Sequence, residues 1–136
     1  MYLGLDLGTS GLKGILINND QEVLGTAEQN YSVQNLSKGW SEQNPNDWIN
    51  ACEKVINSLS SQVSSQMSGL RGIGISGQMH GATLLDKGGE VIRPCMLWND
   101  TRSYAEAQRL DGLSLFREVS GNIVFPGFTA PKLAWV

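Results

Sequence analysis

The segment Gly4–Gly11, with the sequence GLDLGTSG, constrains the fold most, because it joins an apolar strand pattern to a carboxylate and a turn of small residues. A strand here would put Asp6 on one face and three alternating leucines on the other. These leucines are Leu3, Leu5 and Leu7. The sequence therefore predicts a first strand that is apolar on one side and carries a carboxylate at its end.

The turn Gly8–Gly11 has the composition of an anion site. Its glycines let a ligand come close to the backbone, and its N–H groups and hydroxyls can donate to an anion. Mg²⁺ prefers oxygen ligands and keeps water when it bridges to a nucleotide phosphate, so Asp6 suits that ion. A Walker-type loop is excluded, because its glycine spacing and Lys-Ser/Thr ending are missing. The pattern indicates a phosphate-binding turn, while a plain hairpin turn explains the same residues equally well.

The composition is that of one ordered domain. The chain has 136 residues, of which 40% are hydrophobic and 17% charged, and its net charge is -3. Its basic residues are scattered, so we expect no nucleic-acid partner and no membrane partner. Without a signal segment or an apolar run of spanning length, a cytoplasmic location is expected. Cys52 and Cys95 lie far apart and are expected to be buried free thiols.

The first half of the chain predicts a mixed sheet and one long helix. Strands over 12–17 and 22–27 would follow the first strand as an antiparallel meander. Glycines in the first two strands, Gly4 and Gly14, suggest that another element packs closely against them. A helix should begin at Pro45, with Asn44 as its cap, and should fray within 58–68. Its core-facing stripe comprises Trp48, Ile49, Cys52, Val55, Ile56, Leu59 and Val63.

A strand over 70–76 repeats the small-residue pattern of the first strand. The helix before it makes a parallel pairing with the first strand plausible. Both strands would then deliver their next loops, 6–10 and 77–81, to the same sheet edge, where ligands bind in open α/β sheets. We therefore expect two functional loops at that edge.

The second half of the chain predicts a hairpin and three helices. The turn 86–89 should join a hairpin, and an apolar stretch should lead into Asn99-Asp100-Thr101-Arg102. Asn99 or Asp100 either caps a helix that runs to Leu110 or contacts a ligand, and the two roles are compatible. Further helices are expected over 114–120 and from Thr129 onwards. A chain that stops just after a helix start looks truncated.

Four segments taken together resemble the FGGY family of carbohydrate kinases, and within it the xylulokinases. They are Asp6–Ser10, Gly77–Gly81, Leu97–Arg102 and Pro126–Lys132. The resemblance implies an α/β fold of the ribonuclease-H-like type found in the actin, hexokinase and Hsp70 superfamily, a mixed sheet with flanking helices. It implies that residues 1–136 are the N-terminal portion of domain I, with the rest of domain I and the nucleotide-binding domain II absent.

The resemblance also implies roles for residues of the first loop. Asp6 would position Mg²⁺ and the phosphates, and Gly8, Thr9 and Ser10 would face the nucleotide phosphates. Lys13 would reach the same phosphates, or would simply be an exposed strand lysine. ATP and Mg²⁺ are thus the implied cofactors.

The remaining site residues are implied on the sugar side. Met79 and His80 match the xylulokinase sugar-binding pair, and a neutral imidazole offers one donor and one acceptor to hydroxyls. Trp98 would pack on the substrate, and Asp100 would accept a hydrogen bond from a sugar hydroxyl. Core or capping roles explain Trp98 and Asp100 almost as well.

The implied reaction is ATP-dependent phosphorylation of D-xylulose, or a similar ketose, to D-xylulose 5-phosphate. The general base would be an aspartate beyond Val136, so this polypeptide alone should be inactive. The alternatives are another FGGY kinase, acting on ribulose, gluconate or glycerol, a non-enzymatic actin-like ATPase module, and a bare sugar-binding domain. A homodimer is also allowed.

Overall fold

The computed structural model describes the backbone of all 136 residues and the side chains of residues 1–63 and 67–136. The chain forms two compact units. The first comprises 1–32 and 46–78, and the second comprises 33–45 and 79–136.

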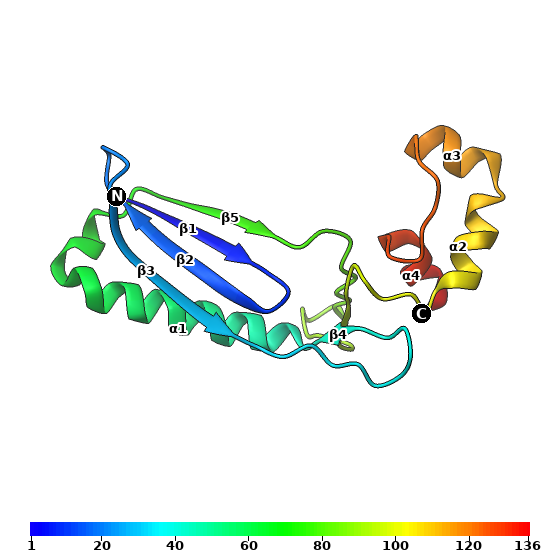
Figure 1. Cartoon of the computed structure of the whole chain (residues 1–136), viewed down its shortest axis with the longest axis horizontal. Helices are drawn as coiled ribbons and strands as arrows, with labels where there is room; N and C mark the ends of the chain where they lie inside the picture. The colour runs from blue at the N-terminus through cyan, green and yellow to red at the C-terminus, as the bar shows by residue number, and fades with distance from the viewer. The chain divides into compact units, whose positions relative to one another are not determined.

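The first unit contains a four-stranded sheet with the order β3-β2-β1-β5 (Figure 1). Its strands are β1 (Tyr2–Leu7), β2 (Gly11–Ile17), β3 (Val23–Asn30) and β5 (Gly72–Gly77). The first three are antiparallel neighbours, and β5 pairs in parallel with β1. The predicted meander and the predicted parallel strand are confirmed. The third strand runs three residues further than predicted, because Gly11 at the start of β2 pairs with Asn30.

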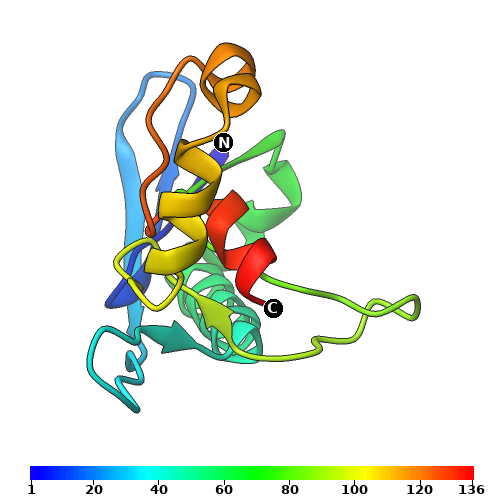
Figure 2. The ribbon, with the colours of Figure 1, turned by 90° about the vertical axis from the view of Figure 1, so that its right-hand side faces the viewer.

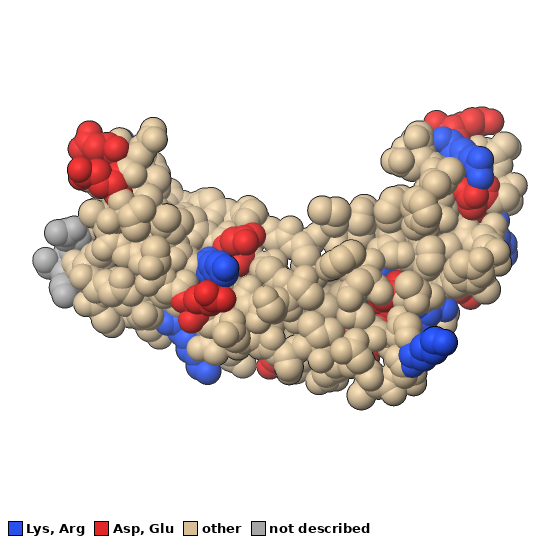
Figure 3. All heavy atoms as spheres, in the orientation of Figure 1, with Lys and Arg blue, Asp and Glu red and all other residues tan. Residues whose placement is uncertain are grey.

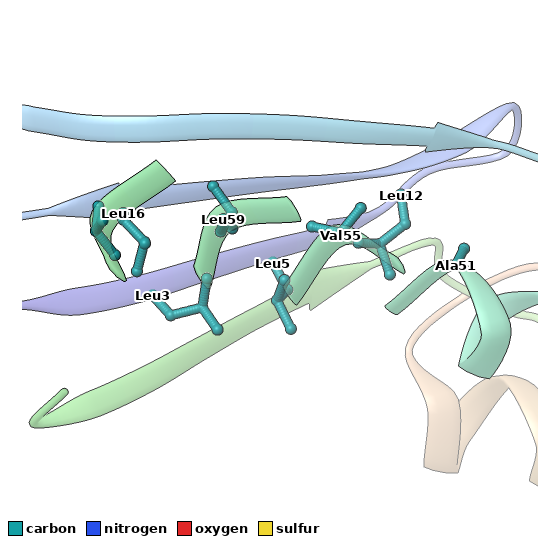
Figure 4. Packing of buried hydrophobic residues seen from close by; sticks show 8 residues of the cluster. Leu3, Leu5, Leu12, Leu16, Ala51, Val55 and Leu59 are labelled. Carbon is teal, nitrogen blue, oxygen red and sulfur yellow. The ribbon is translucent and has the colours of Figure 1, made fainter. Parts of the chain in front are cut away.

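Helix α1 (Pro45–Val63) covers one face of this sheet and forms the core of the unit with it. The strand leucines lie against small and branched side chains of α1 (Figure 4). The core residues are Leu3, Leu5, Leu12, Leu16, Ala51, Val55, Leu59 and Val63. A Cβ at Gly14 would lie 2.4 Å from Val55 Cγ1, so this glycine permits the close approach of α1 that its position in the strand suggested.

The helix stripe was predicted correctly except at its start. Ile49 is 61% exposed, and Ala51 is buried. The α-helix ends at Val63, and the 3₁₀ helix η1 (Ser64–Gly69) follows it. The predicted fraying over 58–68 does not begin before Val63, up to which the α-helix continues, and the side chains of 64–66 lie outside the described residues.

The second unit combines a short strand pair with three helices. Strand β4 (Glu42–Gln43) pairs antiparallel with β6 (Cys95–Met96). The helices are α2 (Tyr104–Asp111), α3 (Ser114–Ser120) and α4 (Thr129–Trp135), and α4 lies beside α2 (Figure 2). The predicted hairpin is confirmed by hydrogen bonds from the Asp86 N–H to the Glu90 carbonyl and from the Ile92 N–H to the Leu84 carbonyl.

On the face seen in Figure 3, the Lys and Arg side chains form no single continuous patch, and uncharged and acidic side chains lie between their groups. Within the described part of the chain, no helix is both long enough and apolar enough to cross a membrane. Cys95 is buried, Cys52 is half-buried, and both are free thiols as predicted.

Candidate phosphate and sugar sites

The turn between β1 and β2 is held by its own backbone and by Tyr31. The Gly8 N–H donates to the Gly11 carbonyl at 3.0 Å, and the Tyr31 N–H donates to the Ser10 carbonyl at 3.2 Å. The Tyr31 hydroxyl donates to the Gly8 carbonyl at 2.7 Å. Burial, reinforced by the negative charge of Asp6, raises the pKa of Tyr31 to about 12, so the phenol stays a donor at neutral pH. Tyr31 was not predicted as a site residue.

Asp6 lies in a row of polar residues that crosses the whole sheet. Strand register places Ser76 of β5 and Lys13 of β2 on either side of Asp6, and Glu28 of β3 beyond Lys13. The Ser76 hydroxyl donates to Asp6 Oδ1 at 2.6 Å. Because residues of equal register share a face, this row lies on the face opposite α1. Ser76 is therefore a second site residue that was not predicted.

The neighbouring row leaves a hollow beside Asp6. Gly74 and Gly4 occupy this row in β5 and β1, where they carry no side chains. A hollow of about 790 Å³ results, lined by both rows. The exposed Asp6 carboxylate and the Lys13 ammonium group therefore border an open space on the sheet.

The loops that follow β1 and β5 meet, as the parallel pairing predicted. The Gln78 N–H donates to the Leu7 carbonyl at 3.1 Å. The Thr9 hydroxyl donates to Gln78 Oε1 at 3.5 Å. This contact joins the turn Gly8–Gly11, called the phosphate-type turn below, to the first residue after β5.

His80, in the second unit, has an unusual backbone and a fixed ring. Its φ is 60°, in the left-handed region that few residues other than glycine adopt. Its imidazole stacks on Phe128, with ring centroids 4.5 Å apart and an angle of 26° between the planes. The His80 side chain is exposed, and Met79 beside it is 68% exposed. An exposed imidazole held on an aromatic ring can offer its nitrogens to a ligand.

Lys132 of α4 holds the His80 loop from inside the unit. This side chain has no exposed surface, and its Nζ donates to the His80 carbonyl at 2.8 Å and to the Gly127 carbonyl at 2.5 Å. Burial lowers the pKa of Lys132 to about 8, although the charges of Asp100 and Cys95 oppose this shift. Neither Lys132 nor Phe128 was predicted as a site residue.

The backbone of Trp98 packs against Gly127. A Cβ at Gly127 would lie only 2.3 Å from the Trp98 carbonyl oxygen, so the two backbones are in direct contact. Trp98 is 48% exposed, whereas Leu97 before it is fully buried. The 126–128 segment therefore touches both the His80 ring and the Trp98 backbone.

Asp100 lies in a buried ion network. It accepts hydrogen bonds from the Ser41 N–H at 2.7 Å and from the Arg102 N–H at 3.0 Å. The Arg102 guanidinium pairs with Asp100 Oδ2 at 2.6 Å and with Glu42 Oε1 at 2.8 Å, and lies 3.6 Å from the ring centre of Trp40. Burial alone would raise the pKa of Asp100, but the hydrogen bonds from Arg102 and Ser41 outweigh it and lower the pKa.

The capping role suggested for Asn99 or Asp100 is wrong. Helix α2 begins at Tyr104, and its N-cap position is Ser103. Asp100 precedes the helix by too many residues to cap it, and both its oxygens already accept hydrogen bonds. Asp100 has no exposed surface for a sugar hydroxyl in this structure.

The donor set around Asp6 fits a hydrated magnesium ion, not an all-protein cage. Among the described residues, no three His, Cys, Asp or Glu side chains gather closely enough to hold a metal. Mg²⁺ commonly uses one or two carboxylates and completes its shell with phosphate oxygens and water. A single exposed carboxylate beside a phosphate-type turn meets that requirement.

Comparisons with known proteins identify the family of this chain. The whole chain, residues 1–136, matches the N-terminal domain of the FGGY family of carbohydrate kinases. A protein of Klebsiella pneumoniae named xylulose kinase is 47% identical over 137 residues, which cover 100% of this chain and 28% of that protein.

Solved structures of sugar kinases have the same fold as this chain. The crystal structure of a "xyloylose kinase" from Brucella ovis has a TM-score of 0.96 and 57% identity, and the match covers 99% of this chain and 28% of that one. A gluconate kinase from Lactobacillus acidophilus, at 22% identity, shares the fold with a TM-score of 0.87 over 98% of this chain and 27% of its own.

The mixed sheet with its flanking helices is therefore the actin/hexokinase-like fold of sugar kinases. The chain belongs to the FGGY family of carbohydrate kinases. It spans about 28% of the length of the Klebsiella pneumoniae protein and of a second curated relative named xylulose kinase, from Escherichia coli.

Proposed function

We propose that this chain is the N-terminal part of domain I of a sugar kinase that transfers the γ-phosphoryl group of ATP to D-xylulose, giving D-xylulose 5-phosphate. The observation that carries the proposal is the exposed His80 imidazole, held by its ring on Phe128 and by its carbonyl on Lys132. The choice of sugar is supported by the Klebsiella pneumoniae xylulose kinase, at 47% identity, and by the Brucella ovis "xyloylose kinase", at 57%.

The phosphate side of the proposed site is the end of β1. Gly8, Thr9 and Ser10 would present N–H and hydroxyl donors to the ATP phosphates, in a turn that Tyr31 holds in shape. Lys13 lies beside Asp6 on the same sheet face and would add a positive charge. Asp6, fixed by Ser76, would hold Mg²⁺ through its free oxygen or through water. When bound, Mg²⁺ would neutralise charge on the phosphates.

The sugar side of the proposed site is the exposed edge formed by Met79, His80 and Trp98. A neutral imidazole would donate to one sugar hydroxyl and accept from another, and the indole would cover an apolar face of the sugar. Asp100 is left out of the proposed sugar contacts, because its carboxylate is buried and paired with Arg102.

Phosphoryl transfer depends mostly on positioning and on neutralising charge, together with a carboxylate that accepts the hydroxyl proton. We propose that this carboxylate lies outside the present chain, because Asp6 sits beside the phosphate-type turn, where it suits a metal better. Without this carboxylate, residues 1–136 alone should not catalyse phosphoryl transfer.

The deciding experiment measures ADP release by the natural protein that contains this chain, with MgATP and D-xylulose, L-ribulose, gluconate or glycerol. We expect D-xylulose to stimulate ADP release most, Asp6→Ala to abolish it and His80→Ala to raise the KM for the sugar. Preference for another of these substrates would replace D-xylulose within the same family. ATP hydrolysis that does not depend on any sugar would support an actin-like ATPase module instead.

The cytoplasmic location and the homodimer stay predictions.

A further inference from the structure

Lys132 is the bulkiest of the fully buried side chains that the structure describes. Burial of a lysine ammonium is costly unless hydrogen bonds replace its lost hydration. Its Nζ donates two hydrogen bonds to backbone carbonyls, one in the His80 loop and one at Gly127. An apolar side chain of similar length would fill the same space without that cost, so the function of this lysine lies in what its nitrogen holds.

The residue that Lys132 holds is under backbone strain. A left-handed φ is unfavourable for a residue other than glycine, and it persists only where surrounding contacts enforce it. For His80 these contacts are the Lys132 Nζ at its carbonyl and the Phe128 ring against its imidazole. Phe128 is itself held by the edge of Phe125, with ring centroids 5.6 Å apart.

One ammonium group thus joins two segments that the sequence separates by 47 positions, His80 and Gly127, since it bonds a carbonyl of each. Phe128 follows Gly127 directly and supplies the ring on which His80 stacks. Loss of the ammonium would release the His80 carbonyl and, at the same time, the backbone that carries its aromatic support.

We infer that Lys132 is a positioning residue for sugar binding: it sets the direction of the His80 imidazole by holding the carbonyls of His80 and Gly127. This inference rests on the proposed function, in which His80 contacts the sugar. Lys132 itself has no exposed surface and so touches neither sugar nor nucleotide.

The first test compares Lys132→Met with Lys132→Gln and with Lys87→Met, a matched control at an exposed lysine of the same unit. In the natural protein, Lys132→Met should raise the KM for D-xylulose about tenfold, as expected for the loss of about 1.4 kcal/mol of binding. The KM for MgATP should not change. Lys132→Gln keeps an amide donor and should recover part of the affinity. Equal rises in both KM values would indicate a general loss of structure and overturn the inference.

A double-mutant cycle tests whether Lys132 acts through His80. In a His80→Ala background, Lys132→Met should raise the sugar KM no further, because no imidazole remains to be positioned. Additive effects of the two substitutions would overturn the inference.

Backbone hydrogen exchange separates the inference from the proposed function. Amides of residues 79–82 should exchange faster in Lys132→Met than in wild type or Lys87→Met, without any sugar present. Unchanged exchange would overturn the inference, whichever sugar the protein phosphorylates. If exchange is faster in Lys132→Met but D-xylulose does not stimulate ADP release by the wild-type protein, the proposed substrate is refuted instead. If Lys132→Met does not fold, Lys132→Gln is compared instead, and its amides 79–82 should still exchange faster than those of wild type, by a smaller factor than the loss of the whole donor would give.

Discussion

The Ser76 hydroxyl donates a 2.6 Å hydrogen bond to Asp6 Oδ1 across the parallel pair β5 and β1. This bond fixes one oxygen of the carboxylate that is proposed to hold Mg²⁺ and leaves the other free. A neutral hydroxyl can fix the carboxylate in this way without neutralising its charge.

Ser76→Ala should therefore lower kcat/KM for MgATP about tenfold, since a hydrogen bond to a charged group contributes about 1.5 kcal/mol or more. Steady-state kinetics at saturating sugar would measure this change. Thr26→Ala, on the same sheet face but in β3, is the control and should keep the wild-type value. Wild-type kinetics in Ser76→Ala would show that the orientation of Asp6 does not depend on this bond.

Tyr31→Phe should weaken nucleotide binding while leaving sugar binding alone. The substitution removes only the hydroxyl that donates to the Gly8 carbonyl at 2.7 Å and keeps the ring in place. A bond of this type contributes about 1 kcal/mol, so the KM for MgATP should rise about fivefold. Tyr2→Phe, at an exposed tyrosine of β1, controls for loss of a phenol elsewhere in the unit. A change in the sugar KM alone would contradict the assignment of this turn to phosphate.

His80→Gly and His80→Ala should separate the imidazole from its strained backbone. Both variants lose the ring and its stacking on Phe128, so both should bind D-xylulose poorly. Only alanine still bears the cost of the left-handed φ, which is about 1 kcal/mol. His80→Gly should therefore melt at a higher temperature than His80→Ala in a thermal-unfolding scan. The reverse order would show that the surrounding contacts do not impose this φ.

Local pattern was sufficient to predict most of the sheet and the long helix. The leucines of β1 and β2 alternate with a period of two, and the α1 stripe recurs at helical spacing, so neighbouring residues alone define each buried face. The close approach at Gly14 followed from the same logic. Ile49 failed because it lies two residues, or more than half a turn, before Ala51 and so faces away from the stripe of Ala51, Val55 and Leu59.

The contacts of the site depended on distant residues and could not be predicted in the same way. The proximity of Ser76 to Asp6 needs the register between two strands, which the predicted parallel pairing suggested but did not define. A lysine after a proline at a helix start is ordinarily exposed, and only the folded unit shows that Lys132 is buried. Asp100 was misread as a helix cap because its partners include Ser41, which lies 59 positions away.

The burial of Lys132 predicts a dependence of stability on pH. Its pKa falls from 10.5 to about 8 in the folded chain, so between these values the unfolded chain binds more protons than the folded one. Stability therefore rises with pH in this window, by at most about 1.4 kcal/mol per pH unit, and the cost of the buried charge is fully present below about pH 8. The melting temperature of wild type minus that of Lys132→Met should increase between about pH 7 and about pH 9.5, whereas the same difference for Lys87→Met should stay constant. Asp100 stays charged throughout this pH range, and its charge favours the protonated form of Lys132. A difference that stays constant or falls with rising pH would show that the ammonium is not destabilised by its burial, and that the carbonyls of His80 and Gly127 compensate for its lost hydration.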